Sequence, residues 1–281
     1  MGKFDGVLIA SDFDNTMVYT EGSLRTGTPP PPVSQKNRDA VAYFMAEGGI
    51  FSVATGRALP SFAKVQPHIP MNGPTILFNG AAIYDFSAGR YLHTAFLPEE
   101  VRDHLTQILR DLPGCAVEIY HDDNSIHALN PNELTRSHEH LTHSATETIF
   151  SIDEAPSPIS KLVFQDEPDR LARVQQYILT QPWSALYECV LSSSVLMEVT
   201  VRGANKGGMV EKLAQLLGIG RQHVYTMGDH ANDIPMLQFA RLGFAPQNAI
   251  DSVKAVPGIR VLSNCWEDAT AEMVAVLDEL Y

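Results

Sequence analysis

Gly6-Val7-Leu8-Ile9-Ala10-Ser11-Asp12-Phe13-Asp14-Asn15-Thr16 is the stretch that decides the fold of this chain. Its apolar run has the length of a strand and ends in polar residues, which is typical of a buried strand in a parallel sheet. Ligands of open α/β sheets bind at the carboxyl ends of such strands, so Asp12 and Asp14 lie where a functional site is usually built. Two carboxylates this close repel each other unless a cation pairs them. Taken alone, the same residues also fit an ordinary turn, in which Asp and Asn are common.

The composition indicates a soluble globular chain with about two domains. It has 281 residues, of which 44% are hydrophobic and 19% charged, and a formal net charge of −13. This acidic balance argues against nucleic acid or an anionic membrane as a general partner, but it allows a small phosphorylated metabolite. No apolar run reaches the ~18 residues of a membrane span, and no secretory signal is recognisable. Since the three cysteines are scattered, we expect reduced thiols and a cytoplasmic location. We also expect a monomer or a small homo-oligomer.

The two ends of the chain share a texture that the middle lacks. Strand-like and helix-like segments alternate at both ends, which favours a parallel sheet covered by helices. From about Phe86 to Arg202, helical stretches are mixed with β-rich pieces in the manner of an antiparallel α+β unit. We therefore predict a doubly wound, mostly parallel, Rossmann-like α/β core made of residues 1–85 and 203–281. Residues 86–202 form an inserted α+β domain.

Polar residues suited to a metal and a phosphate follow several of the predicted strands or begin a helix. Because the carboxyl ends of parallel strands meet at one edge of the sheet, we expect these side chains to converge. Carboxylates suit a hard ion such as Mg2+, whereas a hydroxyl, helix N-terminal amides and a lysine suit phosphate oxygens. The residues are Asp12 and Asp14, Thr55 and Gly56, Lys206, and Asp229, Asn232 and Asp233.

These segments resemble the motifs of haloacid dehalogenase-like (HAD) phosphohydrolases. Asp12-Phe13-Asp14-Asn15-Thr16, Thr55-Gly56-Arg57, Lys206 and Gly228-Asp229-His230-Ala231-Asn232-Asp233 match the four motifs in order. The long gap between the second and third motifs is where the family inserts its C2 cap, and Phe78-Asn79-Gly80-Ala81 is similar to the Cof-type (IIB) branch. The resemblance implies a HAD core with a C2-type cap that closes over the site and supplies substrate selectivity.

The resemblance also implies a role for each matching residue. Asp12 would attack phosphorus to form an aspartyl-phosphate, and Asp14 would act as general acid and base. The residues implied for Mg2+ are Asp12, Asp14 through its backbone carbonyl, Asp229 and Asp233. Those implied for the phosphoryl group are Thr55, Gly56 and Lys206, with Asn232 orienting the lysine or the metal shell. Candidates for contact with the rest of the substrate are Arg57, Asn79, Gly80 and Lys161.

Two residues depart from the commonest form of the motifs. Asn15 stands where glycine is commonest in the family, and Asn205 precedes the lysine where serine is common. Neither change removes a chemical group that the mechanism needs.

The inserted unit carries a concentration of histidines. Five of the ten lie between His121 and His143, and His140 and His143 would share one face of a helix. A transition-metal site is one interpretation of this spacing. A polar, solvated surface is the interpretation we prefer, because the residues do not form an HExxH motif.

The sequence therefore predicts a Mg2+-dependent phosphomonoester hydrolase acting on a small phosphorylated metabolite, with a sugar phosphate as the leading candidate. A phosphotransferase or phosphomutase of the same fold, in which an alcohol accepts the phosphoryl group, fits the same motifs. A phosphate-binding module without catalysis is the third alternative. Intact Asp12, Asp14, Lys206 and Asp229 speak against it.

Overall fold

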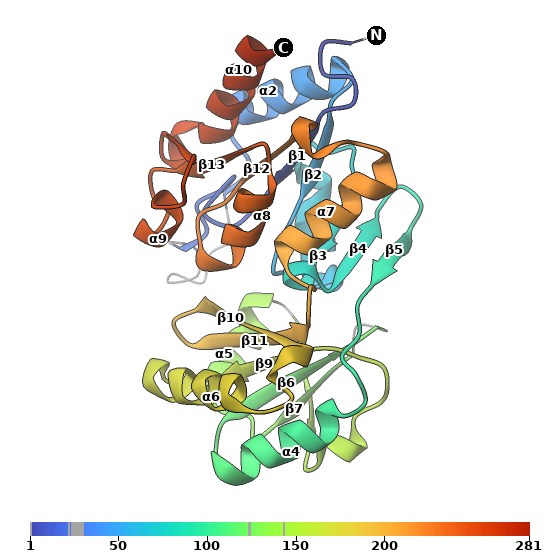
Figure 1. Ribbon diagram of the computed structural model, residues 1–281, viewed down its shortest axis with the longest axis vertical. Helices are drawn as coiled ribbons and strands as arrows, with labels where there is room; N and C mark the ends of the chain where they lie inside the picture. Colours follow the sequence, from blue (N-terminus) through green and yellow to red (C-terminus); the bar gives the residue numbers. More distant parts are fainter. Residues whose placement is uncertain (1, 22, 24–30, 123–124, 143) are drawn as a thin grey trace.

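The computed structural model describes residues 2–21, 23, 31–122, 125–142 and 144–281. The chain forms an α/β unit, which contains both termini, and a second α+β unit beside it (Figure 1). Part of the proline-rich segment 29–32, and His143, lie outside the described residues. None of the helices in the described part of the chain combines the length and the apolar character that a membrane crossing requires.

A five-stranded sheet in the order β14-β13-β12-β1-β2 forms the centre of the larger unit, and every neighbouring pair is parallel. Its strands are β1 (Leu8–Ser11), β2 (Ile50–Val53), β12 (Val224–Met227), β13 (Leu242–Pro246) and β14 (Arg260–Leu262). The chain runs from β1 outward to β2 and later resumes at β12 on the other side of β1. The order of strands therefore reverses between β1 and β12, where an α/β sheet opens a crevice at its carboxyl edge.

Alternation along β1 explains why helices cover both faces of this sheet. Ile9 packs with residues of α2 and α10, whereas Leu8 and Ala10 pack with α7 and α8. All three side chains are fully buried, so the strand reads as a continuous apolar run. The helices of this unit are α2 (Gln35–Ala46), α3 (Leu59–Val65), α7 (Lys206–Leu217), α8 (Ile234–Phe239), α9 (Asp251–Lys254) and α10 (Ala269–Leu280). The predicted α/β fold is confirmed.

A small antiparallel sheet leads from this core into the second unit. It has the order β3-β4-β5, with β3 (Thr75–Leu77), β4 (Ala82–Asp85) and β5 (Arg90–Thr94). The sequence placed residue 86 at the start of the insert, but β5 pairs with β4 and so stays with the core. The reason is the hairpin of β4 and β5, which spans the change in sequence pattern near Phe86. We propose that the inserted cap spans about residues 95–202.

The cap contains a six-stranded sheet in the order β10-β11-β9-β6-β7-β8, antiparallel except for the β7–β8 pair. Its strands are β6 (Ala116–His121), β7 (Ile126–Leu129), β8 (Glu147–Ile149), β9 (Ile159–Gln165), β10 (Tyr187–Ser193) and β11 (Leu196–Val201). Its helices are α4 (Val101–Asp111), α5 (Glu133–Thr142) and α6 (Pro168–Thr180). Helices α4 and α6 cover the face turned away from the core (Figure 1).

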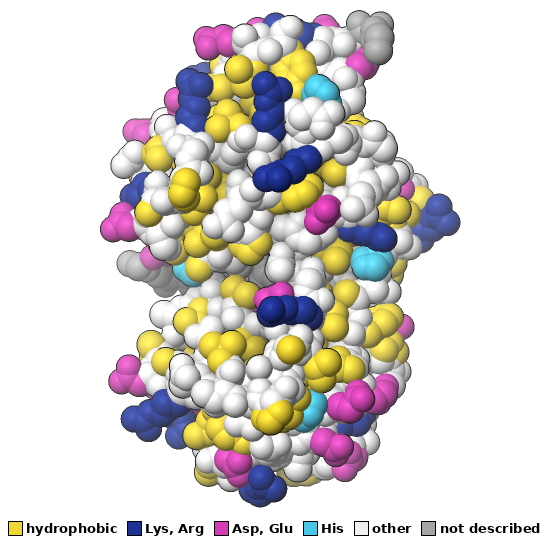
Figure 2. All heavy atoms as spheres, viewed as in Figure 1, with side chains coloured by type: hydrophobic (Ala, Val, Ile, Leu, Met, Phe, Trp, Pro, Cys, Tyr) yellow, Lys and Arg dark blue, Asp and Glu magenta, His cyan; other side chains and the backbone are white. Residues whose placement is uncertain are grey.

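The two faces of the cap sheet differ in polarity. Val117, Ile119 and their neighbours on β9 and β11 pack under α4 and α6 in an apolar cluster. Residues of opposite parity on the same strands, Glu118, Lys161 and Glu198 among them, are buried on the other face. That face looks toward the core, so the polar side chains of the cap gather where the two units meet. In Figure 2 the outline of the molecule narrows at this level.

The turn after β3 fits closely against the start of α7. The residues Phe78, Asn79 and Gly80 all have positive φ, with 108° at Gly80. A Cβ at Gly80 would lie 2.3 Å from the carbonyl carbon of Asn205, the residue that caps α7. Only glycine fits this approach, which holds Asn79 at the edge of the crevice.

We expect Gly80→Ala to lower the free energy of unfolding by about 3 kcal/mol, because a methyl group would overlap rigid backbone at a positive φ. Gly89→Ala is the matched control. Gly89 also has a positive φ, 63°, but a Cβ there would meet nothing within 4 Å. This change should cost only about 1 kcal/mol. Urea unfolding of both variants measures the difference, and equal losses would contradict the close fit at Gly80.

Candidate active site

The predicted polar residues meet at the carboxyl edge of the core sheet, beside the point where its strand order reverses. Asp12 and Asp14 follow β1, and Asp229 follows β12, the neighbouring strand. A backbone hydrogen bond from Asp12 N to Met227 O, 2.9 Å long, continues the ladder between these two strands. A cavity of about 220 Å³ lies over them, with walls from both the core and the cap.

Lys206 is the buried cation of this site. It is the first residue of α7, and Asn205 caps the helix by accepting a hydrogen bond from the Gly208 amide over 2.9 Å. The Lys206 Nζ lies 2.7 Å from Asp12 Oδ1 and 2.6 Å from Asp233 Oδ1, with the lysine side chain 1% exposed. Burial of a charge at this depth requires paired and hydrogen-bonded partners, and the two carboxylates supply them.

Asp233 binds on both of its oxygens. Its Oδ1 accepts from Lys206, and its Oδ2 accepts from the backbone amides of Asp229 and His230, 2.8 and 3.0 Å away. This residue therefore fixes the loop after β12 as well as the lysine. The sequence grouped Asp233 with the metal ligands, and these contacts leave it in a supporting position behind Asp229.

The carboxylates of Asp12, Asp229 and Asp233 form a buried acidic cluster in which one oxygen of each lies within 4.8 Å of the others. Burial, and next to it the neighbouring carboxylates, raise the pKa of Asp12 to about 7, against the lowering effect of Lys206. The same causes raise the pKa of Asp229 well above its ordinary value, although Thr16 donates a hydrogen bond to its Oδ1 over 2.9 Å. Three carboxylates share one lysine, so negative charge is in excess. This donor set fits a hard divalent cation.

Asp14 lies in different surroundings from Asp12. Its two oxygens accept from Nε and Nη2 of Arg57, 2.8 and 2.7 Å away, and its side chain is 32% exposed. Both residues line the cavity. The turn that separates Asp14 from Asp12 depends on Asn15, whose φ is 56°. This left-handed conformation suits glycine best and asparagine next, which accounts for the first departure from the family motif.

In the second motif, Gly56 forms part of the cavity wall and Thr55 lies behind it. Gly56 lines the cavity, packed against Asn79 so closely that a Cβ would lie 2.9 Å from that amide nitrogen. Thr55 is fully buried, and its Oγ1 accepts from the Arg57 amide over 3.1 Å. Thr55 thus shapes the turn that presents Gly56 and Arg57.

A chain of polar contacts crosses from the core to the cap. Asn232 Nδ2 donates to Asn79 Oδ1 over 2.8 Å, and Asn79 Nδ2 donates to Glu198 Oε1 over 2.6 Å. Lys161 Nζ then donates to Glu198 Oε2 over 2.8 Å, above the ring of Tyr120. The contact of Asn232 is with Asn79 and not with Lys206. Lys161 lies behind Glu198 and does not line the cavity.

The structure brings most of the predicted residues to one cavity, and it adds others. Asp12, Asp14, Gly56, Arg57, Asn79, Asp229 and Asn232 line the cavity, whereas Thr55, Gly80, Lys161, Lys206 and Asp233 stand behind this wall. The cap wall contains His138, Thr142, Ser192 and Glu198, none of which is predicted from the sequence as a site residue. Two signals were available: the concentration of histidines in this unit, which was interpreted as a polar surface, and the spacing of four between His138 and Thr142, which places them on one face of α5.

Some polar atoms in these walls lack a hydrogen-bond partner within the described residues. They are Ser192 Oγ on the cap side and His230 Nδ1 and Asn232 Oδ1 on the core side. Buried polar atoms are rarely left unsatisfied in folded proteins, so these three are available to a bound molecule or to water. A ligand with hydroxyl groups would satisfy them.

The family of haloacid dehalogenase-like hydrolases matches residues 9–273. The chain belongs to this family, as its motifs predict.

Its relatives have similar lengths and similar folds. The 5-amino-6-(5-phospho-D-ribitylamino)uracil phosphatase YitU of Bacillus subtilis is 25% identical over 95% of this chain and 96% of its own. The HMP-PP phosphatase of Yersinia enterocolitica is 25% identical over 94% of this chain and 92% of its own. Among solved structures, the HAD subclass IIB sugar phosphatase BT4131 superposes with a TM-score of 0.80 at 19% identity, over 97% of this chain and 99% of its own. This likeness confirms the predicted core with an inserted cap.

A divalent cation should stabilise the protein more strongly as the pH rises, because it binds carboxylates only after they lose their protons. With the pKa of Asp12 raised to about 7 and that of Asp229 also raised, we expect the cation-induced rise in Tm to grow between about pH 6 and about pH 8. Asp229→Asn should remove most of the rise. Asp251→Asn, at a fully exposed carboxylate, is the control. A rise that does not depend on pH or on Asp229 would contradict this site.

Without the cation, the contribution of Asp12 to stability changes with pH in the opposite direction. The folded protein holds the Asp12 proton more tightly than the unfolded chain, so this carboxyl contributes stability below its ordinary pKa of 3.8 and loses that contribution as the pH rises through about 7.

Proposed function

We propose that the protein is a Mg2+-dependent phosphomonoester hydrolase that releases phosphate from a small sugar phosphate through an aspartyl-phosphate intermediate. One observation carries the proposal. Asp12, whose Oδ1 accepts from the buried Lys206, shares a cavity with Asp14, a second carboxylate in contrasting surroundings. A cation in the acidic cluster would keep Asp12 ionised for attack, and Asp14 lies outside that cluster, where it can serve as the proton carrier.

Asp12 is the nucleophile and Asp14 the proton carrier. A carboxylate oxygen of Asp12 forms a bond to phosphorus while the bond from phosphorus to the leaving oxygen breaks, and Asp14 gives its proton to that oxygen. In the second step Asp14 takes a proton from water, the water oxygen bonds to phosphorus, and the bond to Asp12 breaks. Free phosphate leaves, and both carboxyl groups return to their starting states.

The acidic cluster is the place for Mg2+. Asp12, the backbone carbonyl of Asp14 and Asp229 would hold it, and Asp233 would keep Asp229 and Lys206 in place through the contacts described above. The ion offsets the repulsion between an anionic nucleophile and an anionic phosphate.

The remaining motif residues bind the phosphoryl group. Lys206 supplies a fixed positive charge beside Asp12, and Thr55 and Gly56 form the turn that faces the transferring group. Asn232 and Asn79 hold each other at the side of the cavity, so we assign them to the orientation of the substrate. Arg57 holds Asp14, and Lys161 acts through Glu198.

The size and polarity of the cavity support a small hydroxylated substrate. Its volume of about 220 Å³ suits a small metabolite. The wall presents hydrogen-bonding side chains from both units, including the unsatisfied oxygens of Ser192 and Asn232. The names of the similar proteins point the same way, because one is a sugar phosphatase and another acts on a phosphorylated ribityl compound.

We expect Asp12→Asn to lower the hydrolysis of p-nitrophenyl phosphate in the presence of Mg2+ by more than about 10³-fold, because an amide is a poor nucleophile. Release of nitrophenol, followed by its absorbance, is the measurement. Circular dichroism should show that the fold is kept, since the change removes one of three crowded carboxylates. A variant as fast as the wild type would refute the aspartyl-phosphate mechanism.

Asp14→Asn should affect the two chemical steps unequally. Nitrophenolate leaves without a proton, so phosphorylation of Asp12 by the aryl ester should continue, whereas activation of water should fail. Rapid mixing should then show a stoichiometric burst of nitrophenol followed by slow turnover. An alkyl phosphate, whose leaving oxygen needs a proton, should give no burst. Bursts of equal size from both esters would contradict the role of Asp14.

A further inference from the structure

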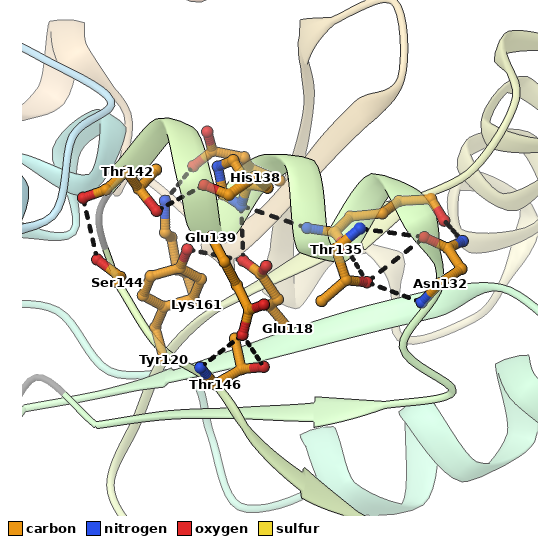
Figure 3. A network of polar contacts seen from close by, with 12 residues as sticks. Glu118, Tyr120, Asn132, Thr135, His138, Glu139, Thr142, Ser144, Thr146 and Lys161 are labelled. Atoms are coloured by element: carbon orange, nitrogen blue, oxygen red, sulfur yellow. Dashed lines mark hydrogen bonds and ion pairs between the residues drawn. The ribbon is translucent and has the colours of Figure 1, made fainter. Parts of the chain in front are cut away.

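Helix α5 of the cap carries a histidine that is held by a buried carboxylate and faces the substrate cavity. His138 Nδ1 lies 2.8 Å from Glu118 Oε2, and the hydroxyl of Tyr120 donates to the same oxygen over 2.8 Å. Figure 3 shows the imidazole of His138 pointing from α5 toward Glu118 on the strand beneath. The Glu118 side chain is 1% exposed, and the His138 side chain 15%.

The contact with Glu118 determines the tautomer of His138. An ionised carboxylate can only accept a hydrogen bond, so Nδ1 must carry a proton and donate it. The amide nitrogen of Gln165, 3.3 Å from Nδ1, cannot donate to an atom that already holds a proton and is a secondary contact. In the neutral form of this tautomer the lone pair is on Nε2. Within the described residues no side chain or backbone group hydrogen-bonds to this Nε2, and the ring lines the cavity together with Asp12 and Asp14.

Glu118 is ionised although it is buried. Burial by itself would raise its pKa, but hydrogen bonds from His138 and Tyr120 and the influence of the imidazole outweigh burial and bring its pKa below the ordinary value. A buried carboxylate is costly to fold around, and an apolar residue of similar size would fill the same space on β6 at lower cost. An arrangement that uses a buried acid to hold one nitrogen of a histidine leaves the other nitrogen fixed in direction.

We propose that His138 is a specificity-determining residue, whose Nε2 accepts a hydrogen bond from a hydroxyl group on the leaving-group side of the substrate. Glu118 and Tyr120 are positioning residues that fix the tautomer and the direction of the ring. This inference rests on the proposed function, because it requires a phosphate ester with a hydroxylated leaving group to occupy the cavity.

The surroundings of His138 favour a neutral, hydroxylated group over a second anion. Glu198 lies in the same cap wall with its charge held by Lys161, and Asp14 lies across the cavity. Thr142, one turn further along α5, uses its hydroxyl proton on the backbone carbonyl of His138 over 2.8 Å and so also offers a lone pair. Acceptors therefore predominate on this wall, and hydroxyl groups are the donors that complement them.

A purely structural role, in which His138 serves only to neutralise Glu118, makes a different prediction. Asparagine and glutamine separate the two roles because each keeps a different part of the imidazole. The amide nitrogen of asparagine takes the approximate place of Nδ1, and the amide of glutamine that of Nε2. His138→Asn thus keeps the donor to Glu118 and loses the group that faces the cavity. His138→Gln does the reverse.

The test compares two kinds of substrate. One is p-nitrophenyl phosphate, which has no hydroxyl groups, and the other is the best substrate from a panel of pentose, hexose and pentitol phosphates. For His138→Asn we expect kcat/KM to fall by about tenfold or more with the sugar phosphate, mainly through KM, and by less than about twofold with the aryl phosphate. His138→Gln should recover part of the loss. Glu118→Gln should also lower kcat/KM for the sugar phosphate relative to kcat/KM for the aryl phosphate, since it weakens the hydrogen bond that fixes the His138 ring.

His140→Asn is the matched control, because this exposed histidine lies on the same helix but does not line the cavity. It should leave kcat/KM unchanged for both substrates. Equal losses with both substrates for His138→Asn, or no loss with either, would overturn the proposal. So would a wild-type enzyme that cleaves the aryl phosphate but no sugar phosphate, a result that leaves the hydrolase mechanism standing. Failure of the mechanism itself appears separately, as phosphate release that does not depend on Asp12.

A measurement on the wild-type protein alone covers the case in which a His138 variant does not fold. Deoxygenation of the best sugar phosphate at each hydroxyl in turn should reveal one position whose loss lowers kcat/KM by about tenfold. Absence of any such position would overturn the proposal. Where both can be measured, the loss from this deoxy substrate and the loss from His138→Asn should not add, because they remove the two ends of one hydrogen bond.

Discussion

One lysine shared by two buried carboxylates is the constraint on which the rest of the site depends. Lys206 reaches Asp12 from α7 and meets Asp233 from the loop after β12, so a single ammonium group joins three elements that are far apart in the chain. Neither carboxylate could be buried without it, and the lysine could not be buried without them. The fold brings them together because β1 and β12 are neighbours at the point where the strand order reverses.

The excess of negative charge around that lysine is unfavourable for stability but suits the binding of a cation. Asp229 adds a third carboxylate, whose one side-chain hydrogen bond among the described residues comes from Thr16, and so adds electrostatic repulsion to the cluster. Natural sites keep such unfavourable groups where a bound charge will later compensate them. The glycine at position 80 and the left-handed Asn15 belong to the same class, because each is conformationally costly for most residues and each fixes a side chain at the crevice.

Much of this could be predicted from the sequence, and the limits have physical reasons. Asp12, Asp14 and Asp229 are each placed by a local rule, since each follows an apolar strand whose carboxyl end must face the crevice. His138 and Glu118 obey no such rule. Their relation arises from the packing of α5 on β6, across a separation in sequence that only the tertiary fold resolves. The start of the insert is hard to predict from the sequence for a similar reason, because β5 is connected to the core only through its pairing with β4.

Asn79 connects the cap to the core through hydrogen bonds on both sides. Its amide donates to Glu198 of the cap and accepts from Asn232, which belongs to the loop that carries Asp229 and Asp233. A movement of the cap away from the core would break the contact with Glu198 and leave the contact with Asn232. A hydrogen bond to a charged group contributes about 1.5–3 kcal/mol. The contact between Asn79 and Glu198 therefore stabilises the observed arrangement of cap and core only modestly. Asn79 thus links the cap by hydrogen bonds to the loop that carries Asp229 and Asp233, in addition to the packing of β10 on that loop.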